Sequence, residues 1–311
     1  MLTFKEGKKS IPVAIIINKK NKKRKNKIIY IDEIDYNEKR RDDEDLDIYD
    51  YIKEDKIRPN KKEMSLNDLK ELEKSLKKGK APDKKNLLKI FEELNEELEE
   101  KIKKEIVLEY GEELEILPRP KSERLYFCGP SESGKSYNVS QYIKNFKKIY
   151  PKKNIYLFSE QEDDNQLDQF KPIRIKIDEE LIEDPITTKE ISNSLTIFDD
   201  IDDIRDKKLK NSIYDLKDTL LKRGRHEDIY TITTNHQCTD FRNTRDTINE
   251  SNIIFVYPRS GAGSSIKYLL KTYLGFTKEQ IQRVLDLPSR WVAIHKTYPV
   301  YVMYQSGIFL L

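Results

Sequence analysis

The 311-residue sequence is 36% hydrophobic and 37% charged, and it contains only 10 Gly and 12 Pro. The charged fraction exceeds the roughly 25% of an average soluble protein, and the low Gly and Pro content excludes collagen-like and Gly/Pro-rich disordered chains. The length suits one full domain with a large appendage, or two modest domains. The longest apolar runs, residues 13–17 and 253–257, are far shorter than the roughly 18 residues of a membrane-spanning helix. We therefore expect a soluble protein with no membrane span.

The two cysteines, Cys128 and Cys238, are 110 positions apart and lie outside any CxxC pattern. Neither a disulfide framework nor a zinc site is indicated. The N-terminal apolar stretch has no small-residue cleavage site and leads into a Lys-rich tract, so no secretion signal is predicted. A reducing compartment fits these observations.

The net charge of +3 is too small to predict nucleic-acid binding, but the charge is unevenly distributed. Residues 1–30 hold ten Lys/Arg and one acid, whereas residues 31–50 hold three basic and ten acidic side chains. The two blocks can neutralise each other when no partner is bound.

Residues 1–120 are predicted to form a charged N-terminal extension with short strands and two helices. Helices are expected over residues 66–78 and 84–110, with Ser65 and Asp83 as their N-caps. In the second helix, apolar residues from Leu87 to Ile106 recur at threes and fours and form one stripe. This stripe needs a partner: the downstream domain or the first helix on one interpretation, a second subunit on the other.

Residues 121–311 are predicted to form an α/β domain, because short β-rich runs alternate with helical segments. Several runs are apolar throughout, as in buried parallel strands. The last three are separated only by short turns, which predicts an antiparallel meander at the sheet edge. The expected strands cover residues 124–128, 154–159, 173–177, 195–200, 229–234, 253–258, 291–296, 301–305 and 308–311.

The sequence GPSESGKS at residues 129–136 has the G-x4-GK-[ST] spacing of a phosphate-binding loop, between a predicted strand and a predicted helix. The glycines let successive backbone N–H groups point at phosphates, and the helix start adds its positive end. Lys135 would bridge the β- and γ-phosphates and Ser136 would ligate Mg²⁺. The alternative is a Gly-rich turn that only caps the helix. The predicted ATP-binding residues are Gly129, Pro130, Ser131, Glu132, Ser133, Gly134, Lys135, Ser136 and Tyr137.

A pair of acids, Asp199 and Asp200, follows the predicted strand LTIF. Asp199 is expected to hold Mg²⁺ through water, and Asp200 to orient or deprotonate the attacking water. The alternative is an acidic loop after a buried strand. Asp202 and Asp203 are expected to be solvated or to cap a helix.

The strand IYTITT delivers four polar residues, Thr234 to Gln237, to the same sheet edge. A polar side chain there can sense the γ-phosphate, with Asn235 as first choice and Gln237 as second. An imidazole at a strand end is more often structural, so His236 is expected to be a hydrogen-bonded structural group.

A tract that ends LLKRGRHEDI precedes this strand, and it is predicted to be helical up to Arg223 and to break at Gly224. Arg225 or Arg223 could act as an arginine finger, which is often supplied by a neighbouring subunit. The alternative is a helix C-terminus whose cations complement its dipole.

The motifs GPSESGKS, LTIFDD, RGRHEDI, TTNHQ and TRDTINESNIIFVYPRSG, within residues 122–260, together resemble the viral genome-packaging ATPases of the FtsK/HerA superfamily. The resemblance is to the poxvirus-type branch found in large DNA viruses and related mobile elements. It implies a RecA-like (ASCE) P-loop NTPase sandwich, ATP hydrolysis coupled to duplex translocation, and a ring of subunits. It also implies roles for Lys135 and Ser136 in the phosphate loop, Asp199 as metal ligand, Asp200 as water-activating acid, Arg225 before the sensor strand, and Asn235 or Gln237 as sensor.

The sequence departs from the family pattern in three respects. The second acid is Asp where Glu is the longer alternative, the sensor strand ends in NHQ where a bare Gln is common, and residues 1–120 match nothing in the family.

Double-stranded DNA is the expected partner, bound through its backbone without sequence preference. Candidate contacts are residues 19–27, with seven cations in nine positions, and the flexible stretch 260–265 with Arg242, Arg245, Arg259 and Lys267. A homo-oligomeric ring and a capsid protein are further expected partners, and the expected location is the host cytoplasm, a viral factory or the virion. Two alternatives remain at this stage: a P-loop kinase for a small substrate, and a nucleotide-switched scaffold that recruits capsid or replication proteins.

Overall fold

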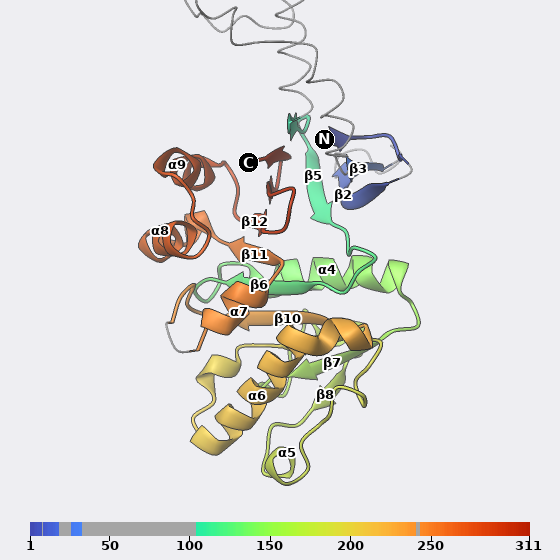
Figure 1. Cartoon of the computed structure of the whole chain (residues 1–311), viewed down its shortest axis with the longest axis vertical. Coiled ribbons are helices and arrows are strands. Elements are labelled where there is room, and N and C mark those ends of the chain that lie inside the picture. Colours follow the sequence, from blue (N-terminus) through green and yellow to red (C-terminus); the bar gives the residue numbers. More distant parts are fainter. Residues whose placement is uncertain (8, 19–25, 33–103, 241–242) are drawn as a thin grey trace, which may run out of the picture. The chain divides into compact units, whose positions relative to one another are not determined.

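The computed structural model of the chain describes residues 1–7, 9–18, 26–32, 104–240 and 243–311 (Figure 1). The segments Leu2–Asp32 and Glu105–Leu311 form one compact unit. This unit therefore includes parts of the predicted N-terminal extension. The helix predicted over residues 66–78 and most of the one predicted over 84–110 lie outside the described residues.

The described unit is built on a ten-stranded mixed sheet in the order β4-β14-β13-β12-β11-β6-β10-β9-β7-β8. The six strands from β11 to β8 are parallel, and β12, β13, β14 and β4 continue the sheet in antiparallel pairing. The predicted C-terminal meander is thus confirmed. The strands are β4 (Glu105–Val107), β6 (Arg124–Cys128), β7 (Asn154–Phe158), β8 (Ile173–Ile175), β9 (Ser194–Phe198), β10 (Tyr230–Asn235), β11 (Ile253–Val256), β12 (Val292–His295), β13 (Tyr301–Tyr304) and β14 (Gly307–Leu310).

Both faces of the central parallel strands β11, β6, β10 and β9 are buried, which explains their apolar sequences. On β6, Leu125 and Phe127 belong to one core cluster, while Tyr126 and Cys128 belong to another. This alternation follows from the two-residue period of a strand. Among the neighbouring strands β11, β6, β10, β9 and β7, β10 lies between the phosphate-loop strand β6 and the acidic strand β9.

Helices cover both faces of the sheet (Figure 1). The helix α4 packs with the core cluster on one face of the sheet. The helices α6 to α9 pack with the two clusters on the other face. Asp206 caps α6 by accepting from two backbone N–H groups, and Thr277 with Gln280 forms a capping box on α9. The helices are α4 (Lys135–Ile149), α5 (Glu180–Glu183), α6 (Lys207–Arg223), α7 (Arg245–Glu250), α8 (Gly263–Thr272) and α9 (Lys278–Asp286).

A second, antiparallel sheet has the order β1-β3-β2-β5 and lies on the α4 side of the main sheet. Its inward side chains, such as Val13 and Ile29, join the core cluster that contains Phe146 of α4. The Asn145 amide on α4 also donates to Ile116 O and to Glu115 on β5. Its strands are β1 (Leu2–Thr3), β2 (Ser10–Asn18), β3 (Lys27–Asp32) and β5 (Glu112–Ile116).

The helix predicted over residues 84–110 is wrong at its C-terminal end, where residues 105–107 form β4. The main-chain groups of β4 pair with β14, and Ile106 lies opposite Ile308 with its side chain buried. Pairing along a sheet edge overrides a local helical pattern, because helix propensity is a weak preference beside tertiary contacts.

Candidate functional site

Three loops meet at the carboxyl edge of the parallel strands: residues 129–134 after β6, residues 199–200 after β9 and residues 236–237 after β10. Parallel pairing of β6, β10 and β9 brings these loops together, because their carboxyl ends share one sheet edge. The predicted phosphate loop and the predicted acid pair are therefore neighbours in space.

The backbone of the phosphate loop needs glycine at two positions. Gly134 has a φ of 105°, in the left-handed region. A Cβ on Gly129 would lie 2.7 Å from Cδ2 of Tyr257 and 2.9 Å from Oγ of Ser133. Tyr257 is buried at the end of β11 and its hydroxyl accepts from the Asn138 amide on α4. Tyr257 therefore packs against the loop at Gly129 and links it to α4 through Asn138. The sequence analysis did not predict this role.

Polar groups in the loop are available for an anion. Ser133 Oγ is buried and has no hydrogen-bond partner among the described residues. The N–H groups in the first turn of α4 have no intrahelical acceptor, as at every helix start. An oxygen-rich anion at this helix N-terminus would satisfy both kinds of group.

Thr234 joins the two acids. Its hydroxyl lies 2.8 Å from Asp199 Oδ1 and 2.9 Å from Asp200 Oδ1, and it accepts the Asp200 N–H at 2.8 Å. Asp200 has a φ of 45°, which is unusual for a residue with a side chain. Thr234 stabilises this conformation and fixes both carboxylates relative to β10.

The carboxyl of Asp199 is almost fully buried. Burial, followed by the nearby Asp200 carboxylate, raises the pKa of Asp199 to about 6. A buried carboxylate of raised pKa beside a second carboxylate gains much from a cation, because a cation offsets both effects.

Lys135 and His236 connect the loop to the acids. Lys135 is only 7% exposed, and its Nζ donates to Gly129 O at 3.0 Å and lies 3.8 Å from Asp200 Oδ1. The His236 ring lies between Lys135 and Asp200. Its Nδ1 is 3.3 Å from Lys135 Nζ, and its Nε2 is 3.3 Å from Asp200 Oδ2. Ser131 Oγ is 3.5 Å from the same Nδ1.

The polar residues at the end of β10 lie in different surroundings. Successive side chains of a strand point to opposite faces, so His236 follows Thr234 toward the acids and Asn235 does not. The Asn235 side chain is buried and its Oδ1 has no partner among the described residues, although its carbonyl accepts from Gly129 N. Gln237 has an exposed side chain, and its carbonyl accepts from the Tyr126 hydroxyl.

Two further acids were expected to be solvated or to cap a helix. Asp203 is exposed, but its Oδ2 lies 3.4 Å from His236 Nε2. Asp202 is partly buried and accepts the His236 N–H at 3.4 Å. Burial and the Asp200 carboxylate raise the pKa of Asp202. Both acids therefore help to orient His236.

Arg223 and Arg225 lie near the amino ends of the parallel strands, opposite the end that carries the phosphate loop. Arg225 influences the pKa of Arg124, the first residue of β6, and the Glu227 carbonyl accepts from Asn193 just before β9. A five-residue strand separates this amino edge from the phosphate loop by roughly 15 Å. Both guanidinium groups are on exposed residues, so within one subunit neither reaches the site.

The loop that carries Arg225 is nonetheless well anchored. Asp228 forms an ion pair with Lys153 and accepts from Ser122. The Ile229 N–H donates to the Gly224 carbonyl at 3.0 Å. These bonds hold the turn while the Arg225 side chain projects to the surface.

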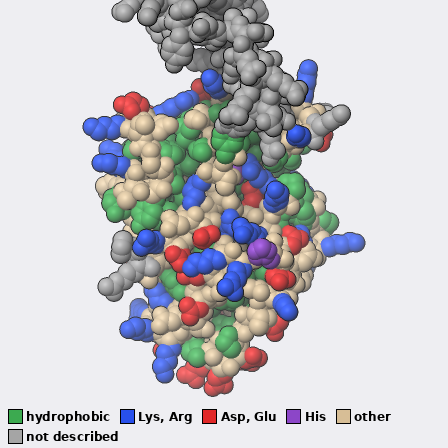
Figure 2. Space-filling view, in the orientation of Figure 1, with side chains coloured by type: hydrophobic (Ala, Val, Ile, Leu, Met, Phe, Trp, Pro, Cys, Tyr) green, Lys and Arg blue, Asp and Glu red, His purple; other side chains and the backbone are tan. Residues whose placement is uncertain are grey.

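The candidate DNA contacts are only partly described. Arg245, Arg259 and Lys267 are exposed, whereas residues 19–25 and Arg242 lie outside the described residues. The stretch 260–265, predicted to be flexible, contains the first turn of α8. On the face shown in Figure 2, Lys and Arg side chains gather near the centre with acidic side chains among them, so this view has no large patch of a single charge.

A comparison with known proteins finds a relative in a virophage. The chain is 40% identical over 219 residues to "uncharacterized protein V3" of Sputnik virophage, an alignment that covers 69% of this chain and 87% of V3. The chain belongs to the same protein family as V3. No family model matches the sequence. In the described part of the chain, each helix is too short or too polar to cross a membrane.

Among solved structures, the genome packaging NTPase B204 of Sulfolobus turreted icosahedral virus 2, in complex with AMPPCP, is 13% identical with a TM-score of 0.40, over 60% of this chain and 97% of B204. The pCW3 conjugation coupling protein TcpA with ATPgS is 11% identical with a TM-score of 0.42, over 66% of this chain and 65% of TcpA. With TM-scores below 0.5, neither likeness establishes a shared activity.

Proposed function

We propose that this member of the V3 family is an ATP-hydrolysing DNA motor that packages viral genomic DNA into capsids. One observation supports this proposal above the others: Lys135 of the phosphate loop lies 3.8 Å from Asp200, and Thr234 links that acid to Asp199. A loop that only caps a helix has no need of a carboxylate pair held beside its lysine.

The residues at this edge fit a magnesium nucleotide. The main-chain N–H groups of residues 131–136 would hold the phosphates, except that of Ser133, which donates to Pro130 O at 3.2 Å. The orphaned Ser133 hydroxyl would join them, with Lys135 at the β- and γ-phosphates. Ser136 and Asp199 would hold Mg²⁺, which needs only one or two protein ligands beside phosphate oxygens and water. The bound ion would neutralise the charge that develops on the phosphates during hydrolysis.

We assign to Asp200 the role of positioning and deprotonating the attacking water. Its backbone conformation is fixed by Thr234, and its Oδ2 faces His236 Nε2 at 3.3 Å. We assign the role of γ-phosphate sensor to His236 in place of Asn235, because His236 alone of the residues after β10 contacts both Lys135 and Asp200 among the described residues. Replacement of His236 by alanine would uncouple nucleotide state from Asp200 while leaving the loop intact.

Arg225 is proposed to act on the nucleotide of a neighbouring subunit. It lies at the amino edge on an anchored turn, so it can complete a site only across an interface. A ring of identical subunits provides such an interface at every site.

Double-stranded DNA is the proposed polymer that the motor translocates. Its phosphates would be contacted by Arg245, Arg259 and Lys267 and by the tract at residues 19–27. A capsid protein is the proposed docking partner, and a viral factory, the host cytoplasm or the virion the proposed location.

The test measures the ATPase rate of the full chain with and without long duplex DNA, together with particle mass. We expect oligomers whose hydrolysis is stimulated by DNA and weakened by salt. Lys135→Ala should nearly abolish turnover, while Lys152→Ala, at an exposed lysine just after the same helix, should retain it. A monomer whose hydrolysis ignores DNA would refute the motor proposal.

A further inference from the structure

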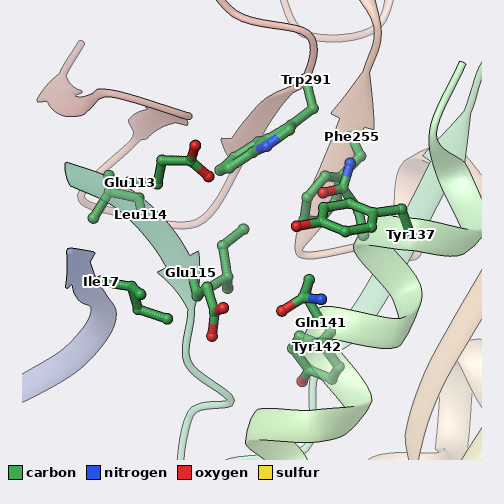
Figure 3. Close-up of a pocket in the computed structure, with 11 residues that line it drawn as sticks. Ile17, Glu113, Leu114, Glu115, Tyr137, Gln141, Tyr142, Phe255 and Trp291 are labelled. Atoms are coloured by element: carbon green, nitrogen blue, oxygen red, sulfur yellow. The ribbon is translucent and has the colours of Figure 1, made fainter. Parts of the chain in front are cut away.

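A cleft opens beside the phosphate loop, between the start of α4 and the strand β5 (Figure 3). Tyr137 and Gln141 project toward it from α4, Glu113 and Glu115 lie on the opposite wall, and Trp291 lies at its end. The enclosed part has a volume of about 40 Å³. This enclosed volume can hold the edge of a planar ring, and the rest of the ring would then lie at the opening of the cleft.

The cleft is adjacent to the phosphate loop both in sequence and in contacts. Tyr137 directly follows Ser136, the last residue of the loop. Asn138, which also lines the cleft, donates to the hydroxyl of Tyr257, and Tyr257 packs against Gly129. A ligand whose phosphates bind the loop can therefore extend into the cleft without leaving the protein surface.

The wall of the cleft is aromatic and rigid. Phe255 and Trp291 are buried, with ring centroids 5.9 Å apart, and Phe255 also stacks on Phe127 at 4.0 Å. Tyr137, by contrast, is 49% exposed. A large aromatic side chain held open on the first turn of a helix offers a face for stacking.

The polar groups of the cleft suit a heteroaromatic edge. The Gln141 amide can both donate and accept, and it has no hydrogen-bond partner among the described residues. Glu115 is held in place by the Asn145 amide at 3.1 Å and by Lys144 at 3.4 Å. The opposite wall is therefore fixed, and the free hydrogen-bonding capacity lies beside Tyr137.

We propose that this cleft receives the purine base of the nucleotide, with Tyr137 as the stacking platform and Gln141 as the polar contact. The inference rests on the proposed nucleotide function of the loop. It gives the strand β5, which precedes the P-loop domain in sequence, a part in the nucleotide site as one wall of the base pocket. A purine should be preferred to a pyrimidine, because its larger ring system covers more of the tyrosine face.

The experiment compares a ligand that has a base with one that lacks it. The dissociation constants of Mg²⁺-ATP, Mg²⁺-UTP and Mg²⁺-tripolyphosphate are measured by calorimetry for the wild-type chain, Tyr137→Ala and Tyr137→Phe. The control variant is Tyr268→Ala, because Tyr268 is a similarly exposed tyrosine (51%) on α8. Tripolyphosphate also reports whether each variant is folded with an intact loop.

We expect Tyr137→Ala to weaken ATP binding about 10-fold, the order associated with loss of one base-stacking contact. Its affinity for tripolyphosphate should be unchanged, and its preference for ATP over UTP should shrink. Tyr137→Phe and Tyr268→Ala should bind all three ligands as the wild type does.

The failures are distinguishable. If Tyr137→Ala leaves ATP affinity unchanged, or weakens ATP and tripolyphosphate equally, the base site is refuted while the phosphate site stands. If the wild type binds neither ATP nor tripolyphosphate, the proposed nucleotide function fails and the base site fails with it.

Discussion

Three threonines of β10 allow a sharp test of the site, because the same substitution should have opposite effects at adjacent positions. The Thr234 hydroxyl accepts the Asp200 N–H and contacts both carboxylates within 2.9 Å. The hydroxyls of Thr231 and Thr233 are buried and have no partner among the described residues. Substitution by valine keeps the branched shape at each position and removes only the hydroxyl.

Thr234→Val loses a charge-assisted hydrogen bond, about 1.5–3 kcal/mol, and leaves the part-buried Asp200 N–H without its acceptor, at most about 1–3 kcal/mol more. Some of that loss will be recovered by relaxation, so we expect the free energy of unfolding to fall by about 2–4 kcal/mol. Thr231→Val and Thr233→Val remove unpaired buried hydroxyls and should leave stability unchanged or raise it by about 1 kcal/mol.

Urea unfolding followed by fluorescence of the single Trp291 measures all three variants on one scale. Thr234→Val should also lose most ATP hydrolysis, because the position of Asp200 depends on the hydroxyl. Equal losses of stability in the three variants would show that valine is simply tolerated poorly on this strand, and would refute the role given to Thr234.

The remaining predictions concern three other residues. His236→Ala should bind ATP with near-wild-type affinity but hydrolyse it at least 10-fold more slowly; hydrolysis at the wild-type rate in steady-state assays would contradict the sensor role. Arg225→Ala should bind ATP but not turn it over, and mixing it with Lys135→Ala should restore some hydrolysis in mixed oligomers; failure to restore any would argue against action across an interface. Burial, with Arg119 as the next cause, lowers the pKa of His295 to about 3, below its value of about 6.5 in an unfolded chain. The neutral ring therefore stabilises the fold fully above pH 6.5, and this contribution is lost at about 1.4 kcal/mol per unit as the pH falls toward 3. In His295→Phe, which retains an aromatic ring beside Tyr301, stability measured from pH 6.5 to 4.5 should fall less steeply than in the wild type; parallel curves would disprove this.

The main elements could be predicted because their signals are local. The phosphate loop is specified by the spacing of Gly129, Gly134 and Lys135, and the buried strands by unbroken apolar runs. The short turns between the last three strands were sufficient to predict their antiparallel order. Each of these features depends on neighbours in sequence.

The parts that were missed depend on contacts between distant segments. Which residue after β10 faces the acids depends on strand parity, which Thr234 fixes through its bonds to Asp199 and Asp200. Asn235 and His236 are both polar, so the sequence alone does not show which of them faces the acids. Tyr257 supports the loop from a strand 119 residues after Asn138 in sequence. The β-structure at Ile106 depends on pairing with the far C-terminus.

The distance between Arg225 and the phosphate loop has a consequence for assembly. Under the proposed role of Arg225, a subunit with its arginine at one end of the sheet and its phosphate loop at the other completes a neighbour's site by bringing unlike surfaces together. Repetition of a head-to-tail junction gives a closed ring or an open filament, whereas a two-fold pair would place each arginine at the other subunit's loop. Under the same proposal, an isolated subunit would not hydrolyse ATP, and hydrolysis would begin only after the subunits had assembled.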